Sequence, residues 1–299
     1  MVELQVFIST YNRPDLITKS IDSIISQSGV NFEVIISDNS TNDKTGEIIN
    51  EKYKNTVKYI RRVPSVDVIS HLNLILQDVQ AKNFMIFHDD DIMLPGMLRT
   101  LITELNMDDD TVAVGCNANT IYHNGKINHW FLRDKINNQI IYNGKEMAIR
   151  YLSPNLIVPF PSYMYNSSVA KSINFDVSKG GKYCDVSFLV DIANRGKVVM
   201  ISVPLMNYYV HAGQDSFKND FLAKIKLIQY FVKILKMSRR DSKLFSFRLT
   251  NIYNELKSVN NLTVKSFFTK RFFILYKYDF RSFLKLALLS LKNNVRFLN

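Results

Sequence analysis

The stretch Asn83-Phe-Met-Ile-Phe-His-Asp-Asp-Asp91 is the most informative part of the sequence for the fold. Four of its first five residues are apolar, which predicts a buried strand. The strand ends in three consecutive carboxylates, which repel one another unless a divalent cation with oxygen ligands binds between them. At the carboxyl end of a strand in an α/β sheet, this acidic tip would face the crevice in which ligands bind. The alternative is a solvated loop in which Asp91 only starts the next helix.

The regions around this stretch alternate short β-rich runs with amphipathic helical patterns, which is typical of a mainly parallel sheet. Pro14 fits the first turn of a helix. We therefore predict an α/β, Rossmann-like fold with a mainly parallel, mixed sheet flanked by helices. The predicted strands are 4–9, 32–37, 57–61 and 84–87, and the predicted helices are 14–26, 44–53, 70–79 and 95–105.

The middle of the chain has a more mixed pattern. We expect two separate strands at 112–118 and 120–123, followed by a hairpin turn at His123-Asn-Gly-Lys126. Helices are predicted at 145–152 and 185–195, and a further strand at 197–203 should end at Pro204. From Phe217 onward the pattern is helical. This predicts a first domain at 1–214 and a helical region at 215–299.

Composition indicates a folded protein, since 46% of the 299 residues are hydrophobic and 22% are charged. The two cysteines cannot form a disulfide framework and suggest a reducing compartment. The amino terminus has neither the basic nor the apolar region of a signal peptide, and no stretch of 18 apolar residues is present. We therefore expect a cytoplasmic protein.

The positive charge is concentrated in the C-terminal region. From Asp215 onward there are 12 lysines and 6 arginines against 5 acidic residues, a net charge of +13, whereas the whole chain carries +11. The same segment holds 16 of the 35 phenylalanines and tyrosines. This composition favours attachment to an anionic membrane surface, which would be the inner face of the cell membrane. The alternative is a packed helical subdomain with a solvated basic face. Nucleic-acid binding is not expected, because no recognised nucleic-acid module is present.

Polar clusters follow three of the predicted strands. They are Thr10-Tyr-Asn-Arg13, Asp38-Asn-Ser-Thr41 and Asp89-Asp-Asp91. Because the carboxyl ends of parallel strands lie on one edge of a sheet, we expect all three clusters to meet in a single crevice.

These residues resemble the family 2 glycosyltransferases, enzymes of GT-A fold that use nucleotide-diphospho sugars. The resemblance is carried by Ser9-Thr-Tyr-Asn-Arg-Pro-Asp15, the Asp38-Asn-Ser turn, the Asp89-Asp-Asp91 tip and a later acid at the start of a helix. It covers about residues 3 to 213. The order of strand, acid and helix is more specific than any of the short motifs by itself.

The resemblance implies a donor site on the first half of the sheet. Thr10, Tyr11 and Arg13 would line the base pocket, and Asp38 would accept a hydrogen bond from uracil or another base. Arg61, at the end of the third strand, would meet the diphosphate, although such arginines are often only solvated.

The acidic tip would be the DxD element of the family. Asp91 would bind Mn²⁺ or Mg²⁺ between the two phosphates, because a metal ion stabilises the charge of a departing nucleoside diphosphate. Asp90 would reach the ribose or the water shell of the metal, and Asp89 is the least defined donor contact. His211 resembles a histidine that closes over the metal and phosphates, so it is a candidate for donor binding and for metal binding.

Asp185 is the candidate catalytic base, because an inverting transfer requires the acceptor hydroxyl to lose a proton. The alternative is a plain helix N-cap. Family members often carry Glu-Asp at this point, whereas this chain has Cys184-Asp185, so a neighbouring charge is missing.

The sequence therefore predicts a metal-dependent, inverting glycosyltransferase. Its donor would be a nucleotide-sugar, with UDP as the expected carrier, and its acceptor a carbohydrate, presumed by analogy to be lipid-linked and to belong to bacterial surface polysaccharide synthesis. Two alternatives stay open. A nucleotidyltransferase also uses metal-binding acids, but the first strand is not followed by a glycine-rich basic phosphate loop. A non-catalytic membrane- or nucleic-acid-binding protein with a degenerate transferase domain is the other.

Overall fold

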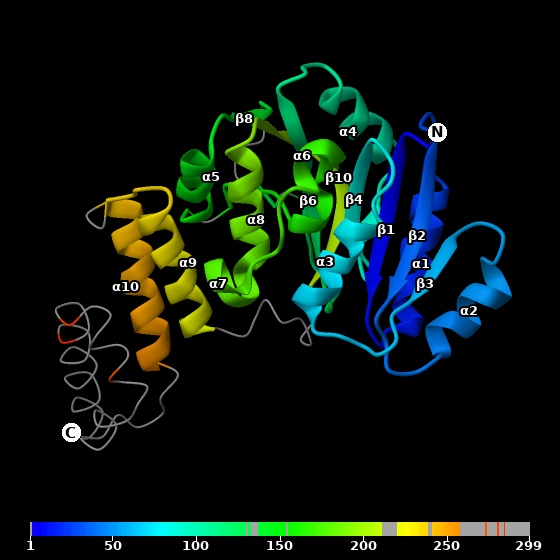
Figure 1. Ribbon diagram of the computed structural model, residues 1–299, viewed down its shortest axis with the longest axis horizontal. Coiled ribbons are helices and arrows are strands. Elements are labelled where there is room, and N and C mark those ends of the chain that lie inside the picture. The colour runs from blue at the N-terminus through cyan, green and yellow to red at the C-terminus, as the bar shows by residue number, and fades with distance from the viewer. Residues whose placement is uncertain are drawn as a thin grey trace.

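The centre of the structure is one large twisted sheet with helices on both faces (Figure 1). This computed structural model describes residues 2–129, 131–132, 137–153, 155–210, 220–238 and 241–257, and three single positions further on, 273, 280 and 284. Within these residues, ten strands join the sheet, and eight of them follow the order β3-β2-β1-β4-β9-β6-β10-β5, with β7 beside β6 and β8 beside β10.

The first half of the chain forms the parallel part of the sheet, as predicted. Its strands β1, β2, β3 and β4 alternate along the chain with helices α1, α2 and α3, and α4 follows after a short strand, β5. The observed bounds lie close to the predicted ones: β1 Leu4–Thr10, α1 Pro14–Ile25, β2 Phe32–Asp38, α2 Lys44–Lys52, β3 Lys58–Arg61, α3 Val68–Asp78, β4 Asn83–His88, β5 Ile92–Met93 and α4 Met97–Leu105.

The strand register brings the polar clusters to one edge. Thr10 is the partner of Asp38 across β1 and β2, and Asp38 is the partner of Arg61 across β2 and β3. On the other side of β1, Ser9 is the partner of His88. The carboxyl ends of four strands therefore meet in one row, as parallel pairing requires.

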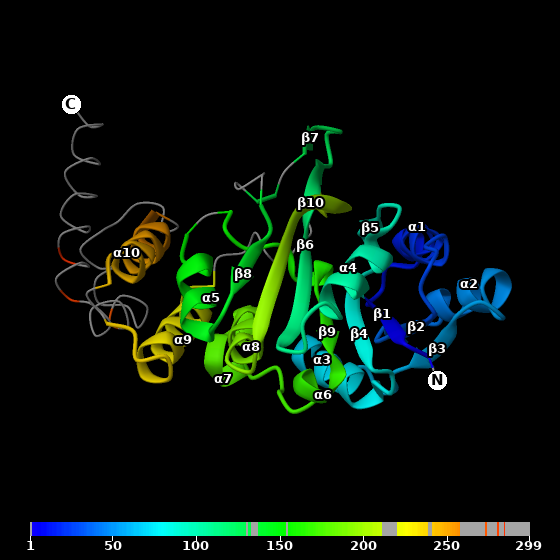
Figure 2. The ribbon, with the colours of Figure 1, turned by 90° about the horizontal axis from the view of Figure 1, so that it is seen from above.

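The second half of the chain extends the sheet with two long strands that are parallel to each other and three short antiparallel ones. These are β6 Thr111–Tyr122, β7 Ile127–Asn128, β8 Gln139–Ile141, β9 Met164–Asn166 and β10 Lys197–Val210. Strands β6 and β10 are parallel to each other, and β9 lies antiparallel between β4 and β6. The β6–β7 hairpin, which confirms the predicted turn, projects from the body of the molecule (Figure 2).

Two boundaries predicted in this half are wrong. The two strands expected at 112–118 and 120–123 are one continuous strand, β6. The strand expected to end at Pro204 continues to Val210. Its register against β6 shifts between Ile201 and Met206, and this irregularity accommodates a proline that has no N–H to donate to the ladder.

Short helices and turns connect the strands of the second half, and two longer helices follow the last strand, β10. Their bounds are α5 Gly144–Tyr151, η1 Phe160–Ser162, α6 Ser167–Ala170, α7 Val177–Gly180, η2 Gly181–Tyr183, α8 Cys184–Ala193, α9 Phe221–Lys233 and α10 Ser242–Lys257. The predicted helices at 145–152 and 185–195 are thus confirmed as α5 and α8.

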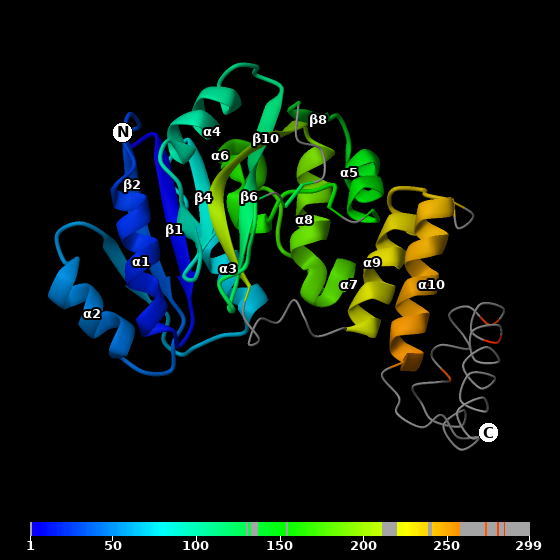
Figure 3. The same cartoon turned by 180° about the vertical axis from the view of Figure 1, so that it is seen from behind.

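Two hydrophobic cores cover the two faces of the sheet. On one face, α1 and α4 pack their apolar side chains onto the sheet through residues such as Ile21 and Leu101. On the other face, α5 and α8 do so through residues such as Met147 and Phe188. Figures 1 and 3 show these two layers from opposite sides.

Helix α9 packs into the second core rather than standing apart from the first 214 residues. Leu227, Ile228 and Phe231 are buried there. Gly181 adopts a positive φ of 58°, and a Cβ at this position would lie 2.6 Å from the Cβ of Ala223. Helix α9 therefore lies directly against the Gly180-Gly181 turn that precedes α8. Within the part of the chain that the structure describes, no helix is both long and apolar enough to cross a membrane.

Candidate active site

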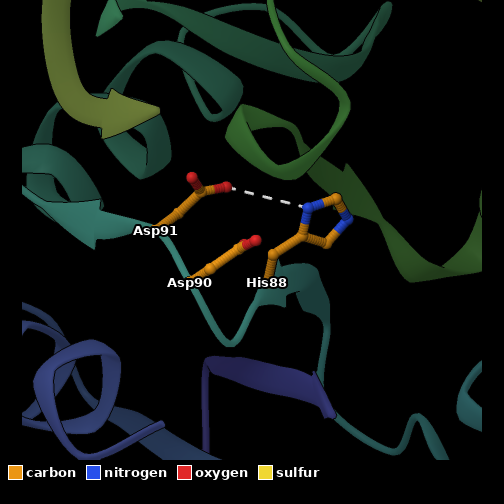
Figure 4. A group of neighbouring side chains, drawn as sticks. All are labelled: His88, Asp90 and Asp91. Atoms are coloured by element: carbon orange, nitrogen blue, oxygen red, sulfur yellow. Dashed lines mark ion pairs between the residues drawn. The ribbon is translucent and has the colours of Figure 1, made fainter. Parts of the chain in front are cut away.

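The acidic tip lies in the short turn between β4 and β5, at the edge where β1 and β2 end. Figure 4 shows His88, Asp90 and Asp91 pointing into the same space. The main-chain carbonyl of His88 accepts a hydrogen bond from Ser20 Oγ at 3.0 Å, and the N–H of Met93 donates to Ser23 Oγ at 3.0 Å. Helix α1 thus fixes both ends of the turn.

Asp89 and Asp90 are held by the loop that follows β1. Thr10 Oγ1 donates a hydrogen bond of 2.7 Å to Asp89 Oδ2. One guanidinium nitrogen of Arg13 lies 3.2 Å from Asp89 Oδ1 and 3.1 Å from Asp90 Oδ2. Burial raises the pKa of Asp89, whereas Thr10 and Arg13 lower it. Two clusters that the sequence placed on one edge are therefore in direct contact.

Asp91 is the most completely buried acid of the tip, with none of its surface exposed. Its Oδ1 accepts a hydrogen bond of 3.0 Å from the main-chain N–H of Tyr209, in β10. Its Oδ2 is buried and has no hydrogen-bond partner among the described residues. Burial, and secondly the charge of Asp90, raises the pKa of Asp91 well above its usual range. A cation bound at Oδ2 would relieve this cost, so the donor set fits a divalent metal ion.

His88 is a candidate ligand that the sequence reasoning missed. Its Nδ1 lies 3.7 Å from Asp91 Oδ2, and one ligand atom from each of His88, Asp90 and Asp91 lies within 4.8 Å of the others. The available signal was the histidine directly before the acidic triplet, immediately after the strand predicted at 84–87.

Asp38 and Arg61 occupy the neighbouring strand ends. Asp38 is fully buried and accepts hydrogen bonds from the Tyr59 hydroxyl, at 2.7 Å, and from the Ser40 N–H, at 2.8 Å. Arg61 lies 3.5 Å from the Asp38 carboxylate and donates to the carbonyls of Ser40 and Asn42. Both residues therefore shape the turn after β2. Tyr11 is 51% exposed at the same edge.

Asp185 lies in the first turn of α8, a helix that packs against β6 and β10. The N-cap position is Tyr183 and shows no side-chain capping bond, so Asp185 does not serve as the cap. Burial raises its pKa to about 6. Its charge is the second cause, after burial, of the raised pKa of Tyr151, so this phenol lies near the carboxylate. A partly buried carboxyl with such a pKa is suited to general base catalysis near neutral pH.

A row of aromatic rings links the acidic tip to α8. The ring centroids are separated by 6.3 Å from His88 to Phe160, by 5.8 Å from Phe160 to Phe175, and by 4.2 Å from Phe175 to Phe188. Phe188 lies one turn after Asp185 in α8, on the same helical face. Packing of these rings fixes the position of α8 relative to the tip.

The structure thus brings Thr10, Arg13, Asp89 and Asp90 into one hydrogen-bonded or ion-paired group. Asp91 lies in the same turn and is bonded to Tyr209, and Asp38 and Arg61 lie one and two strands further on from β1. Asp185 belongs to a separate element, and His211 lies outside the described residues. The roles that the sequence predicts for these side chains stay predictions.

A mainly parallel α/β sheet with an acidic turn at its carboxyl edge is the architecture of the GT-A glycosyltransferases, and solved structures similar to this chain belong to that class. The chain belongs to the family described as glycosyl transferase family 2, whose profile matches residues 5–173. It is a transferase enzyme of that family.

Curated relatives support this assignment. An uncharacterized glycosyltransferase of Haemophilus influenzae is 25% identical, and the alignment covers 98% of this chain and 94% of the relative. A GalNAc(5)-diNAcBac-PP-undecaprenol beta-1,3-glucosyltransferase of Campylobacter jejuni is 31% identical over 114 residues, which cover 36% of this chain and 35% of the relative.

Solved structures show the same fold at low sequence identity. Residues 1–349 of S. aureus TarS, in complex with UDP-GlcNAc, superpose with a TM-score of 0.61 at 15% identity, covering 98% of this chain and 92% of the other. The mannosyltransferase PcManGT of Pyrobaculum calidifontis, in complex with GDP-Man and Mn²⁺, gives a TM-score of 0.54 at 16% identity, with coverage of 96% and 86%.

Proposed function

We propose that this chain is an inverting, metal-dependent glycosyltransferase that moves a sugar from a nucleotide-diphospho sugar to a carbohydrate acceptor. The observation that carries the proposal is the buried Oδ2 of Asp91, which has no hydrogen-bond partner among the described residues and lies beside Asp90 and His88. A divalent cation, Mn²⁺ or Mg²⁺, bound there would stabilise the negative charge on the departing nucleoside diphosphate.

The donor would lie along the row of strand ends. Thr10, Tyr11 and Arg13 would line the base pocket, Asp38 would accept a hydrogen bond from the base, and Arg61 would meet the diphosphate. Arg13 supports this placement because it already links the loop after β1 to Asp89 and Asp90. Asp91 would hold the metal, and Asp90 would face the ribose or a metal-bound water. His211 would complete the donor site from the segment after β10. A UDP carrier is supported by the fold shared with the UDP-GlcNAc complex of TarS.

Asp185 would act as the base that removes the proton from the acceptor hydroxyl. Its pKa of about 6 leaves it ionised at neutral pH, yet still basic enough to accept a proton in the transition state. The aromatic row from His88 to Phe188 supports the assignment, because it couples the position of α8 to that of the acidic tip.

The acceptor would be a lipid-linked carbohydrate of a bacterial surface polysaccharide, reached at the inner face of the cell membrane. The Campylobacter relative, by its name, acts on an undecaprenol-linked glycan. The basic, aromatic region at 215–299 suits an anionic lipid surface. Sedimentation with anionic liposomes, compared between the full chain and a chain ending at Lys257, tests this. Unchanged sedimentation would place the contact elsewhere. A cut at residue 216 would be a poor test, because it removes α9 from the core.

The decisive experiment is a donor-hydrolysis screen over nucleotide-sugars, with Mn²⁺, with Mg²⁺ and with a chelator. We expect release of a nucleoside diphosphate, not pyrophosphate, from one donor and only with metal. Asp91→Ala should abolish the metal-dependent part of nucleotide binding, whereas Asp109→Asn, at an exposed loop position, should leave it intact. Full binding by Asp91→Ala, or equal binding with chelator, would refute the metal site.

A further inference from the structure

We propose that His88 is a protein ligand of the divalent cation beside Asp91, through Nδ1, and that this imidazole makes the site prefer Mn²⁺ to Mg²⁺. The inference rests on the proposed metal-dependent function. It adds a ligand and an ion preference that the acidic tip by itself does not imply.

The distances suit ligands around one ion. Nδ1 of His88 lies 3.7 Å from Oδ2 of Asp91, and with a carboxylate oxygen of Asp90 these atoms lie within 4.8 Å of one another (Figure 4). Ligand atoms at about 2.1 Å from an octahedral ion are about 3.0 Å apart in adjacent positions and about 4.2 Å apart in opposite ones. The 3.7 Å separation falls between these values, so only a small closure is needed.

The pair is not explained by a direct hydrogen bond. A separation of 3.7 Å exceeds the roughly 3.2 Å limit of an N–H···O bond. The Asp91 oxygen on this side is buried and lacks a partner among the described residues, although the other oxygen of the same carboxylate is bonded to Tyr209. A buried carboxylate oxygen without a hydrogen bond, aimed at an imidazole nitrogen beyond hydrogen-bond reach, is what a metal site without its ion would show.

The imidazole is also held in place before an ion arrives. His88 is the last residue of β4, paired with Ser9 of β1, and its carbonyl is bonded to Ser20. Its ring lies against Phe160, with the centroids 6.3 Å apart. The side chain is nevertheless 39% exposed, so an ion can reach the nitrogen from solvent. Fixed ligands of this kind reduce the ordering cost of binding.

The nitrogen ligand determines the preferred ion. Mg²⁺ favours oxygen ligands and gives up its water reluctantly. Imidazole suits transition metals, and carboxylates suit Mg²⁺, Ca²⁺ and Mn²⁺. Among the ions named in the proposed function, a site with an imidazole beside its carboxylate ligand therefore fits Mn²⁺ better than Mg²⁺.

The direct test is pulsed EPR of Mn²⁺ bound to the full chain in the presence of UDP, with histidine labelled with ¹⁵N. We expect a hyperfine coupling from a directly bound histidine nitrogen. The coupling should disappear in His88→Asn and persist in His123→Asn, which changes an exposed histidine in the β6–β7 turn. Bound Mn²⁺ without any histidine coupling would overturn the inference while leaving the proposed function intact. Failure to bind Mn²⁺ at all would overturn both.

A second measurement tests whether His211, the other candidate histidine, supplies the nitrogen ligand. Coupling that survives in His88→Asn but is lost in His211→Asn would assign the nitrogen to His211 and overturn the inference.

Asparagine places an oxygen close to the position of Nδ1, so His88→Asn should keep Mg²⁺ binding nearly unchanged. Mn²⁺ binding should weaken roughly tenfold, the lower end of what disturbed metal sites lose. Equal weakening for the two ions, or none for either, would contradict the proposed preference.

Discussion

Two acidic regions of this enzyme differ in how their carboxylates are held. At the tip after β4, Asp89 and Asp90 are bound by Thr10 and Arg13, and Asp38 nearby is bound by Tyr59 and Ser40. At the start of α8, the carboxyl of Asp185 lies near the phenols of Tyr151 and Tyr165, and the hydrogen bonds that lower its pKa come from main-chain N–H groups of its own helix.

The difference shows how one residue type can take several roles. Carboxylates held by a guanidinium and hydroxyls stay ordered and form a rigid frame for a charged ligand. A carboxylate left without such partners in a partly dry position keeps a raised pKa and can take up a proton. Asp91 stands between the two cases. One of its carboxylate oxygens accepts a hydrogen bond, and the other has no hydrogen-bond partner in the described structure.

The largest effect that would test this contrast is expected at Asp185. Asp185→Asn should lower turnover by roughly 10²–10⁴-fold, the usual contribution of a general base, and leave donor binding nearly unchanged. The matched control is Asp191→Asn in the same helix, whose carboxylate is bound by Lys179 and Tyr230. That variant should lose stability but keep its turnover per folded molecule. Normal turnover in Asp185→Asn would place the base elsewhere.

The pH dependence of the reaction should reflect the titration of the same carboxyl group, that of Asp185. Since the pKa of Asp185 is raised to about 6, kcat/KM should fall about tenfold per pH unit below that value and be level above it. Stability should change in the opposite direction. The folded state binds the proton more tightly than the unfolded state, so this group stabilises the fold at low pH.

That contribution is lost as the pH rises from about 4 through about 6, where the unfolded and folded forms of Asp185 ionise in turn. Urea titrations at several pH values should therefore show Asp185→Asn more stable than the parent above pH 6. If the difference in unfolding free energy between Asp185→Asn and the parent stays the same across this pH range, the Asp185 carboxyl is not desolvated.

A smaller effect is expected from loosening the acidic tip. Arg13→Gln removes the cation shared by Asp89 and Asp90 and should destabilise the fold by about 1–2 kcal/mol, low in the range for charged hydrogen bonds because Arg13 is 36% exposed. Nucleotide affinity should fall as well. Lys19→Gln, at an exposed position of α1, should change neither quantity in urea unfolding and nucleotide titration. If Arg13→Gln and Lys19→Gln have the same stability and nucleotide affinity, the positions of Asp89 and Asp90 do not depend on Arg13.

The smallest effect is expected at Tyr59, whose hydroxyl is bonded to Asp38. Tyr59→Phe removes the 2.7 Å hydrogen bond to the buried Asp38 and should cost about 1 kcal/mol of unfolding free energy. Tyr142→Phe is the matched control, because Tyr142 is 60% exposed and its change should have no measurable effect. A neutral result at Tyr59 would indicate that Arg61 and Ser40 hold Asp38 without help.

The sequence determined the parallel part of the fold and the place of the site. Apolar runs with helical and strand periods located β1 to β4 and α1 to α4 within a few residues. Parallel pairing then required Thr10, Asp38 and the acidic tip to share an edge. Local patterns were sufficient here, because the spacing of apolar residues and the position of a strand end can both be recognised within a single short segment of sequence.

Only the tertiary structure decided which atoms meet across that edge. Strand β9 is three residues long and carries no periodic signal, so its place between β4 and β6 could not be predicted. The bond from Tyr209 to Asp91 joins positions 118 residues apart and depends on how far β10 continues beyond Pro204. The approach of His88 to Asp91 depends on the turn after β4. Such contacts arise from register and packing between distant segments, which the order of residues along one segment does not specify.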